Sequence, residues 1–293
     1  MNTGSTHRKM HLVECPRDAM QGWPSFIATE KKTEYLNQLL KCGFDTLDFG
    51  SFVSPKAIPQ MADTKEVLKG LKTEGSATKL LAIVANLRGA QEACTHETIK
   101  YLGFPFSVSE TFQVRNTNST MDASLKLVEE IQKLCIETKK ELVIYLSMGF
   151  GNPYGDPYSP GIVLEWARKI SNLGIRIISV ADTVGLATAE QVYSTVSTVL
   201  EDFPDHEIGV HLHSAPDNWK EKIDAALKAG CTRFDGALKG IGGCPMANDV
   251  LVGNMNSELM IDHFIEVGAD LHINKYELDK SIRIADEIFS SHN

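Results

Sequence analysis

Two histidines stand two residues apart in the stretch GVHLHSAPDN, residues 209–218. Because side chains alternate along a β-strand, His211 and His213 would share one face, while Val210 and Leu212 fill the other. Two imidazoles on one face are close enough to bind a single metal ion. A hydrogen-bonded pair of structural histidines is the alternative interpretation.

An arginine and an aspartate are adjacent in the stretch PRDAMQ, residues 16–21. A surface salt bridge between Arg17 and Asp18 is one interpretation. The other is a fixed positive charge beside a metal-binding carboxylate, which are the groups needed to stabilise an enolate.

A cysteine lies in the glycine-rich stretch GIGGCPMAN. Gly240, Gly242 and Gly243 allow unusual backbone dihedrals and loop movement. On such a loop the Cys244 thiol could be a proton donor or a nucleophile, or simply a small apolar residue in a turn. Cys15, in contrast, ends a predicted buried strand, which favours a packing role.

Eight short apolar, β-branched runs predict the strands that position these residues. They cover residues 11–15, 44–50, 79–85, 99–107, 141–147, 175–182, 207–213 and 232–238. Amphipathic stretches between and after them predict helices. The clearest are 29–42, 119–135, 159–174, 188–203, 215–230, 257–267 and 275–290.

Strands that alternate with helices predict an α/β fold with parallel strands. Eight such units most simply close into a TIM (β/α)8 barrel, with extra C-terminal helices after the last strand. An open doubly wound sheet is the alternative, but no Gly-x-Gly-x-x-Gly turn follows the first strand. We therefore expect residues 1–293 to form a single TIM-barrel domain.

The active site of such a barrel lies at the carboxyl ends of its strands. The polar residues expected there are Arg17, Asp18, Asp48, Ser51, Tyr145, Ser147, Asp182, Thr183, His211, His213, Cys244 and Asn254. Two imidazoles with an aspartate and an asparagine amide favour Mg²⁺ or Mn²⁺, because Zn²⁺ usually prefers more nitrogen or sulfur donors.

Charge and cysteine usage restrict the class of protein. The 293 residues carry a formal net charge of -9, which argues against nucleic-acid binding. The six cysteines are scattered, the first ten residues lack the apolar core of a signal peptide, and no apolar run approaches the ~20 residues that span a bilayer. These features predict a cytoplasmic protein that does not enter the membrane.

Several motifs in order resemble the 3-hydroxy-3-methylglutaryl-CoA lyases, within the wider group of metal-dependent barrel lyases and Claisen-type synthases. The resemblance covers the chain from about Leu12 to the end. Its landmarks are PRDAMQ, SFVSPKAIPQM, NLRG, SMGFGNPY, ADTVG, VHLHS and GGCPMA followed by GN.

The resemblance implies a retro-Claisen cleavage of 3-hydroxy-3-methylglutaryl-CoA to acetoacetate and acetyl-CoA by a homodimer that acts in leucine breakdown. It implies that a divalent cation, Mg²⁺ or Mn²⁺, is held by Asp18, His211, His213 and Asn254. Arg17 would neutralise the enolate oxygen and Cys244 would take part in proton transfer, while either Asp18 or His211 could be the base. The residues expected around the substrate are Gln21, Asp48, Arg88, Tyr145, Ser147, Asp182, Thr183 and Glu258, with Arg88 offered to a CoA phosphate.

The chain departs from the resemblance at two positions that bear on the substrate. Asp48 stands where we expect glutamate, and Val143 where we expect arginine. These departures leave a lyase for another 3-hydroxyacyl-CoA as an alternative. A synthase that runs the condensation, of the 2-isopropylmalate or homocitrate type, is a second alternative, but such enzymes usually carry an additional C-terminal domain. A non-catalytic binding module is a third, but it would not need this set of polar residues at one rim.

Overall fold

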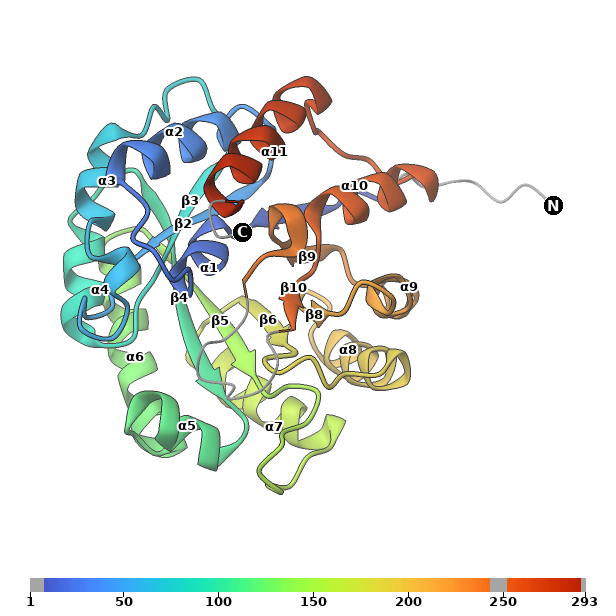
Figure 1. The fold of residues 1–293 in the computed structure, drawn as a ribbon. Coiled ribbons are helices and arrows are strands. Elements are labelled where there is room, and N and C mark those ends of the chain that lie inside the picture. The colour runs from blue at the N-terminus through green and yellow to red at the C-terminus, as the bar shows by residue number, and fades with distance from the viewer. Residues whose placement is uncertain (1–7, 243–251, 291–293) are drawn as a thin grey trace.

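The computed structural model describes residues 8–242 and 252–290. Eight parallel strands close into a barrel surrounded by helices (Figure 1). The strands, in the order in which they neighbour one another, are β1 (His11–Glu14), β2 (Thr46–Ser51), β3 (Lys79–Ile83), β4 (Ile99–Ser107), β5 (Glu141–Ser147), β6 (Ile177–Ala181), β7 (Glu207–His211) and β9 (Arg233–Gly236). β9 pairs with β1 and closes the barrel, so the predicted TIM barrel is confirmed.

Helices connect successive strands and continue beyond the last one. In chain order they are α1 (Pro16–Gln21), α2 (Thr29–Leu39), α3 (Thr64–Gly70), α4 (Leu87–Cys94), α5 (Glu110–Thr117), α6 (Met121–Glu137), α7 (Pro160–Ser171), α8 (Ala189–Asp202), α9 (Trp219–Ala229), α10 (Ser257–Glu266) and α11 (Lys275–Phe289), with short 3-10 helices η1 (Pro59–Met61) and η2 (Leu238–Gly240). The extra C-terminal helices are confirmed, and α11 packs against α2 (Figure 1). No helix in the described part of the chain has the length and apolar character needed to cross a bilayer.

Side-chain caps fix where the long helices begin. The hydroxyls of Thr120, Ser159 and Thr188 each accept a hydrogen bond from the amide three residues later. These bonds satisfy amides that have no partner within the helix. α6, α7 and α8 therefore begin one residue after the capping hydroxyl, within two residues of where the predicted helices begin.

The seventh predicted strand, residues 207–213, is interrupted in the structure. β7 ends at His211, and β8 (His213–Ser214) leaves the barrel to pair antiparallel with β10 (Gly253–Asn254). In this small ribbon His213 stands opposite Asn254. The correction matters for function, because the ribbon brings two predicted metal ligands together from positions distant in the sequence.

The barrel interior contains apolar residues and a buried charge. An apolar cluster of inward-facing residues consists of Leu81, Ile83, Val143, Tyr145 and Ile177. Arg233 of β9 is fully buried, and a Cβ at position 209 would lie 2.7 Å from its Cδ. Gly209 on the adjacent strand therefore makes room for this arginine.

Candidate functional site

Helix α1 brings Arg17 and Asp18 to the mouth of the barrel. β1 ends at Glu14, and Pro16 occupies the first position of α1, where its missing N–H leaves no helical bond unmade. Arg17 is 8% exposed and Asp18 is 6% exposed, with 3.0 Å between Arg17 Nη1 and Asp18 Oδ1. The surface salt bridge, one of the two interpretations of this pair, is therefore wrong.

Arg17 is held by three side chains. Its Nη2 donates to Asp48 Oδ2 at 2.7 Å and its Nε donates to the same oxygen at 3.0 Å. Its Nη1 donates to Asp18 and, at 2.9 Å, to Gln21 Oε1. Within residues 8–242 and 252–290, these bonds use four of the five N–H groups of the guanidinium, so one Nη2 hydrogen remains for a substrate oxygen.

For Asp48 and for Asp18, burial raises the pKa of the carboxyl group and Arg17 lowers it. Burial raises the pKa of Asp48 to about 6, although Arg17 opposes this. Burial acts in the same direction on Asp18, but Arg17, His211 and His213 outweigh it and lower the pKa of Asp18 below its ordinary value. Asp18 is therefore an ionised ligand at neutral pH.

The two histidines converge on Asp18. Their Nε2 atoms are 3.3 Å apart, and ligand atoms of Asp18, His211 and His213 all lie within 4.8 Å of one another. Burial and the neighbouring His211 lower the pKa of His213 to about 4, so this imidazole is neutral at physiological pH. Neutral imidazole is the form that binds a metal ion.

Asn254 completes this group of polar ligands. Its Nδ2 donates to Asp18 Oδ2 at 2.7 Å and to the Ile241 carbonyl at 2.9 Å. Its Oδ1 is buried and has no hydrogen-bond partner in the described part of the chain. Gly242 has a φ of +108°, and a Cβ there would lie 2.4 Å from Asn254 Nδ2, so this glycine permits the close approach.

These four residues fit a hard divalent cation. Two imidazole nitrogens, a carboxylate and an amide oxygen form the mixed ligand set that Mg²⁺ and Mn²⁺ accept. Asn254 presents Nδ2 to Asp18, and a half-turn of its amide would direct Oδ1 at a bound cation and give this buried oxygen a partner.

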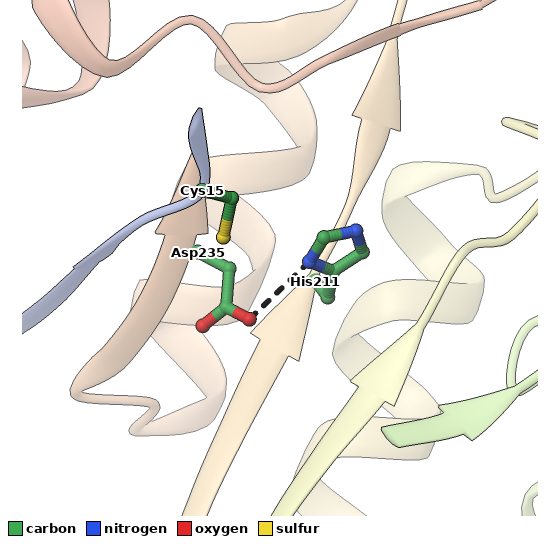
Figure 2. A group of neighbouring side chains, drawn as sticks. All are labelled: Cys15, His211 and Asp235. Carbon is green, nitrogen blue, oxygen red and sulfur yellow. Dashed lines mark hydrogen bonds and ion pairs between the residues drawn. The ribbon is translucent and has the colours of Figure 1, made fainter. Parts of the chain in front are cut away.

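Asp235, which the sequence analysis did not identify, orients His211. The two residues stand opposite each other in β7 and β9, and His211 Nδ1 is 3.2 Å from Asp235 Oδ2 (Figure 2). This contact turns the other ring nitrogen, Nε2, toward Asp18 and His213. The burial of His211 lowers its pKa, but Asp235 and Asp18 outweigh burial and raise it above the ordinary value. A carboxylate within a predicted barrel strand was the signal in the sequence.

Lys222 is a second residue that the sequence analysis did not identify, and it holds the backbone of His213 by a hydrogen bond. Its Nζ donates to the His213 carbonyl at 2.7 Å and to Asp182 Oδ2 at 2.9 Å, with both side chains almost fully buried. Asp182 was predicted to surround the substrate. The structure places its carboxylate on Lys222 and on the Ala187 amide instead.

A cavity of about 520 Å³ opens beside the candidate metal centre. Its walls contain eight of the residues predicted from the strand ends and the motifs: Arg17, Asp18, Gln21, Tyr145, Ser147, Thr183, His211 and His213. The buried Tyr145 hydroxyl finds no hydrogen-bond partner among the residues that the structure describes. Val53, Ile58 and Ile83 add an apolar side to the same cavity, so it suits a ligand with both polar and apolar parts.

Arg88 and Glu258, which the resemblance places around the substrate, do not line this cavity. Arg88 is exposed on α4 and is absent from the cavity walls. Glu258 accepts the backbone amide of Lys239 and so holds the start of the glycine-rich loop. Cys244 lies outside the described residues.

The sequence and the fold match proteins of known activity. The family model HMGL-like matches residues 11–283. Hydroxymethylglutaryl-CoA lyase YngG of Bacillus subtilis is 34% identical over 232 residues, which are 79% of this chain and 77% of that protein. The 3-hydroxy-3-isohexenylglutaryl-CoA/hydroxy-methylglutaryl-CoA lyase of Pseudomonas aeruginosa is 31% identical over 270 residues, which are 90% of this chain and 89% of that protein.

A solved structure agrees with these relatives. The HMG-CoA lyase of Acinetobacter baumannii in complex with coenzyme A and 3-methylmalate superposes with a TM-score of 0.89 at 31% identity. The match covers 96% of this chain and 92% of that one.

Proposed function

The chain belongs to the HMGL-like family, and from this premise we propose that it is a divalent-metal-dependent lyase that cleaves 3-hydroxy-3-methylglutaryl-CoA to acetoacetate and acetyl-CoA. In this retro-Claisen reaction a base removes the proton of the tertiary hydroxyl. The bond between C2 and C3 breaks, and the resulting acetyl-CoA enolate takes up a proton. The observation that carries the proposal is the convergence of Asp18, His211 and His213 beside Arg17 and its remaining N–H.

Each residue of the proposed site has a defined task. Asp18, His211, His213 and Asn254 would hold Mg²⁺ or Mn²⁺. When bound, such a cation supplies Lewis acidity that lowers the pKa of the substrate hydroxyl. The remaining Nη2 hydrogen of Arg17 would bind the thioester oxygen as it gains enolate charge, where a fixed donor is most effective.

We assign the two proton transfers to different residues. Asp18 and His211 are both placed to accept the hydroxyl proton, and the geometry favours neither. Cys244 would donate to the enolate, as the family resemblance implies. Tyr145, Ser147 and Thr183 would line the acyl group, because all three face the cavity.

We further propose that residues 1–293 act as one domain, that the working form is a homodimer, and that the reaction belongs to leucine catabolism. A cytoplasmic location is supported by the free state of all five cysteines in the described part of the chain, which is typical of a reducing compartment. Coenzyme A in the similar Acinetobacter structure supports an acyl-CoA substrate.

The decisive assay is acetoacetate release from 3-hydroxy-3-methylglutaryl-CoA with Mg²⁺ or Mn²⁺ and a thiol, with and without EDTA. We expect turnover that EDTA abolishes and that is lost in His213→Ala. His272→Ala is the matched control, because this histidine is exposed and its backbone lies against Gly43, before the amino end of β2 and so away from the barrel mouth. A folded protein that binds the cation but releases no acetoacetate would refute the named substrate.

One observation favours a second candidate, a lyase for another 3-hydroxyacyl-CoA. Val143, where the resemblance leads us to expect arginine, lies in the apolar cluster with Leu81, Ile83 and Ile177. Ile83 of this cluster lines the cavity, so the site could take an acyl group with a larger apolar substituent at C3. A panel of 3-hydroxy-3-alkylglutaryl-CoA thioesters, compared by kcat/KM, separates the two candidates.

A further inference from the structure

Cys15, expected to serve only packing, lies with two polar ligands on the inner side of the candidate metal centre. Figure 2 shows its thiol directed at the space between Asp235 and the His211 ring. One ligand atom from each of Cys15, His211 and Asp235 lies within 4.8 Å of the other two. Cys15 comes from the end of β1, while the other two come from β7 and β9, so closure of the barrel creates the group.

The unpaired polar atoms of this group point to a ligand. Asp235 is 2% exposed, and its Oδ1 has no hydrogen-bond partner among the described residues. The Cys15 thiol is 1% exposed and has only a long contact of 3.9 Å with the Val13 carbonyl. A buried carboxylate oxygen without a partner is costly unless something binds it.

We propose that Cys15 Sγ, His211 Nδ1 and the Asp235 carboxylate form a second metal site, selective for soft divalent cations such as Zn²⁺ and Cd²⁺, whose occupation inhibits the enzyme. Sulfur, imidazole nitrogen and carboxylate are the donors that Zn²⁺ prefers, whereas Mg²⁺ does not bind thiols well. Three protein ligands leave a fourth tetrahedral position for water. The cation replaces two protons: the thiol proton is released to solvent, and the Nδ1 proton of His211 moves to Nε2 or is released as well, with no electron transferred.

Inhibition follows from the shared histidine. His211 presents Nδ1 to this second site and Nε2 to Asp18 and His213. A soft cation on Nδ1 would replace the hydrogen bond that this nitrogen donates to Asp235 and that sets the orientation of the ring. It would also bring a second positive charge close to the catalytic cation. Burial, followed by the charge of Asp235, raises the pKa of Cys15 well above its ordinary value, so the thiol stays neutral until such a cation binds.

Cd²⁺ absorption tests the site without any activity measurement. The background protein carries Cys94→Ser and Cys244→Ser, because the hydrogen-bonded Cys94–Cys135 pair and the thiol of the glycine-rich loop could also bind Cd²⁺. We expect one equivalent of Cd²⁺ to produce thiolate-to-metal absorption in this background. Adding Cys15→Ser should abolish the absorption. Adding Cys42→Ser should leave it unchanged, because Cys42 is buried elsewhere and forms a hydrogen bond with Ser281.

Activity gives a second readout in the otherwise unchanged protein. With Mg²⁺ present, Cys15→Ser should raise the Zn²⁺ concentration for half-inhibition by roughly 10- to 100-fold, the range that loss of even an outer hydrogen-bond partner produces. If Cys15→Ser does not fold, Asp235→Asn in the same background should weaken Cd²⁺ binding while the thiol remains. Unchanged Cd²⁺ absorption in the Cys15→Ser protein, or none in the background, would overturn the proposal.

Discussion

Arg17 donates two hydrogen bonds to one carboxylate oxygen of Asp48, from Nη2 at 2.7 Å and from Nε at 3.0 Å. These two bonds fix the plane of the guanidinium between α1 and β2. The shorter aspartate, where we expected glutamate, therefore still reaches the arginine directly. It leaves the free Nη2 hydrogen at a fixed position, as electrostatic stabilisation of an enolate requires.

Arg17→Lys should lower kcat by about 10²- to 10³-fold, the usual effect of removing one donor to a developing oxyanion. Lysine keeps the charge but not the planar fork. The affinity for Mg²⁺ should change little, because Asp18 stays ionised. Steady-state kinetics and calorimetric Mg²⁺ titration measure the two effects separately.

The matched control for this substitution is Arg168→Lys. Arg168 forms a similar two-pronged pair with Asp202, but on the exposed surface. Exposed pairs contribute little, so kcat and stability should both be nearly unchanged. A normal kcat in Arg17→Lys would show that the guanidinium does not bind the enolate.

Asn254→Ala should weaken Mg²⁺ or Mn²⁺ binding by about 10- to 100-fold. The substitution removes the unpartnered Oδ1 and the hydrogen bond from Nδ2 to Asp18. Mn²⁺ binding followed by electron paramagnetic resonance gives the affinity directly.

Asn256→Ala in the same segment is the control. Its side chain caps α10 by accepting the Leu259 amide, so its loss should cost about 1 kcal/mol of stability. Mn²⁺ affinity should be unaffected. Equal Mn²⁺ affinities in the two variants would remove Asn254 from the ligand set.

The alternation of strands with helices, and of side chains along each strand, was sufficient to predict the fold and most residues at the barrel mouth. The eight β-branched runs correspond to the eight barrel strands, and His211 and His213 do converge. The interruption after His211 was not predictable, because the pairing of His213 with Asn254 depends on a return of the chain forty residues later. A local pattern contains no information about such a return.

Two charged residues that support the site, Asp235 and Lys222, were not predicted, for different reasons. Asp235 stands opposite His211 only because the barrel closes in one register. Lys222 lies in a predicted amphipathic helix, where lysines usually face solvent, yet it shares the buried stripe of α9 with Ala225 and Ala226. Arg88 is exposed, because helix phase buries Gly89 and Ala90, and its assignment to a CoA phosphate stays a prediction.

Lys222→Met should lower the free energy of unfolding by about 3–5 kcal/mol. The substitution leaves the Asp182 carboxylate buried without its cation and the His213 carbonyl without its donor. Urea unfolding of apo proteins, compared at equal m-values, gives the difference.

Lys220→Met on the same helix is the control for lost lysine charge. Lys220 pairs with Asp224 at an exposed i,i+4 spacing, which is worth about 0.3–0.5 kcal/mol. A similar small change in both variants would mean that Asp182 finds another partner or takes up a proton without strain.

Glu14 should make the stability of the protein fall as the pH rises from about 5 to about 8. This buried carboxyl accepts the Leu238 amide and the Ser257 hydroxyl, and burial raises its pKa from 4.5 to about 8. Between these two values the folded protein keeps a proton that the unfolded chain has lost. Each pH unit in this window therefore removes up to about 1.4 kcal/mol from the free energy of unfolding.

Glu14→Gln isolates this contribution, because the amide is neutral at every pH and can still accept from Leu238 and donate to Ser257. Its unfolding free energy should change less between pH 5 and pH 8 than that of the unaltered protein. Glu137→Gln, at an exposed position near the end of α6, should reproduce the unaltered slope. Urea unfolding at several pH values measures these differences. If the free energy of unfolding has the same pH dependence in Glu14→Gln and in the unaltered protein, Glu14 is ionised in the folded state.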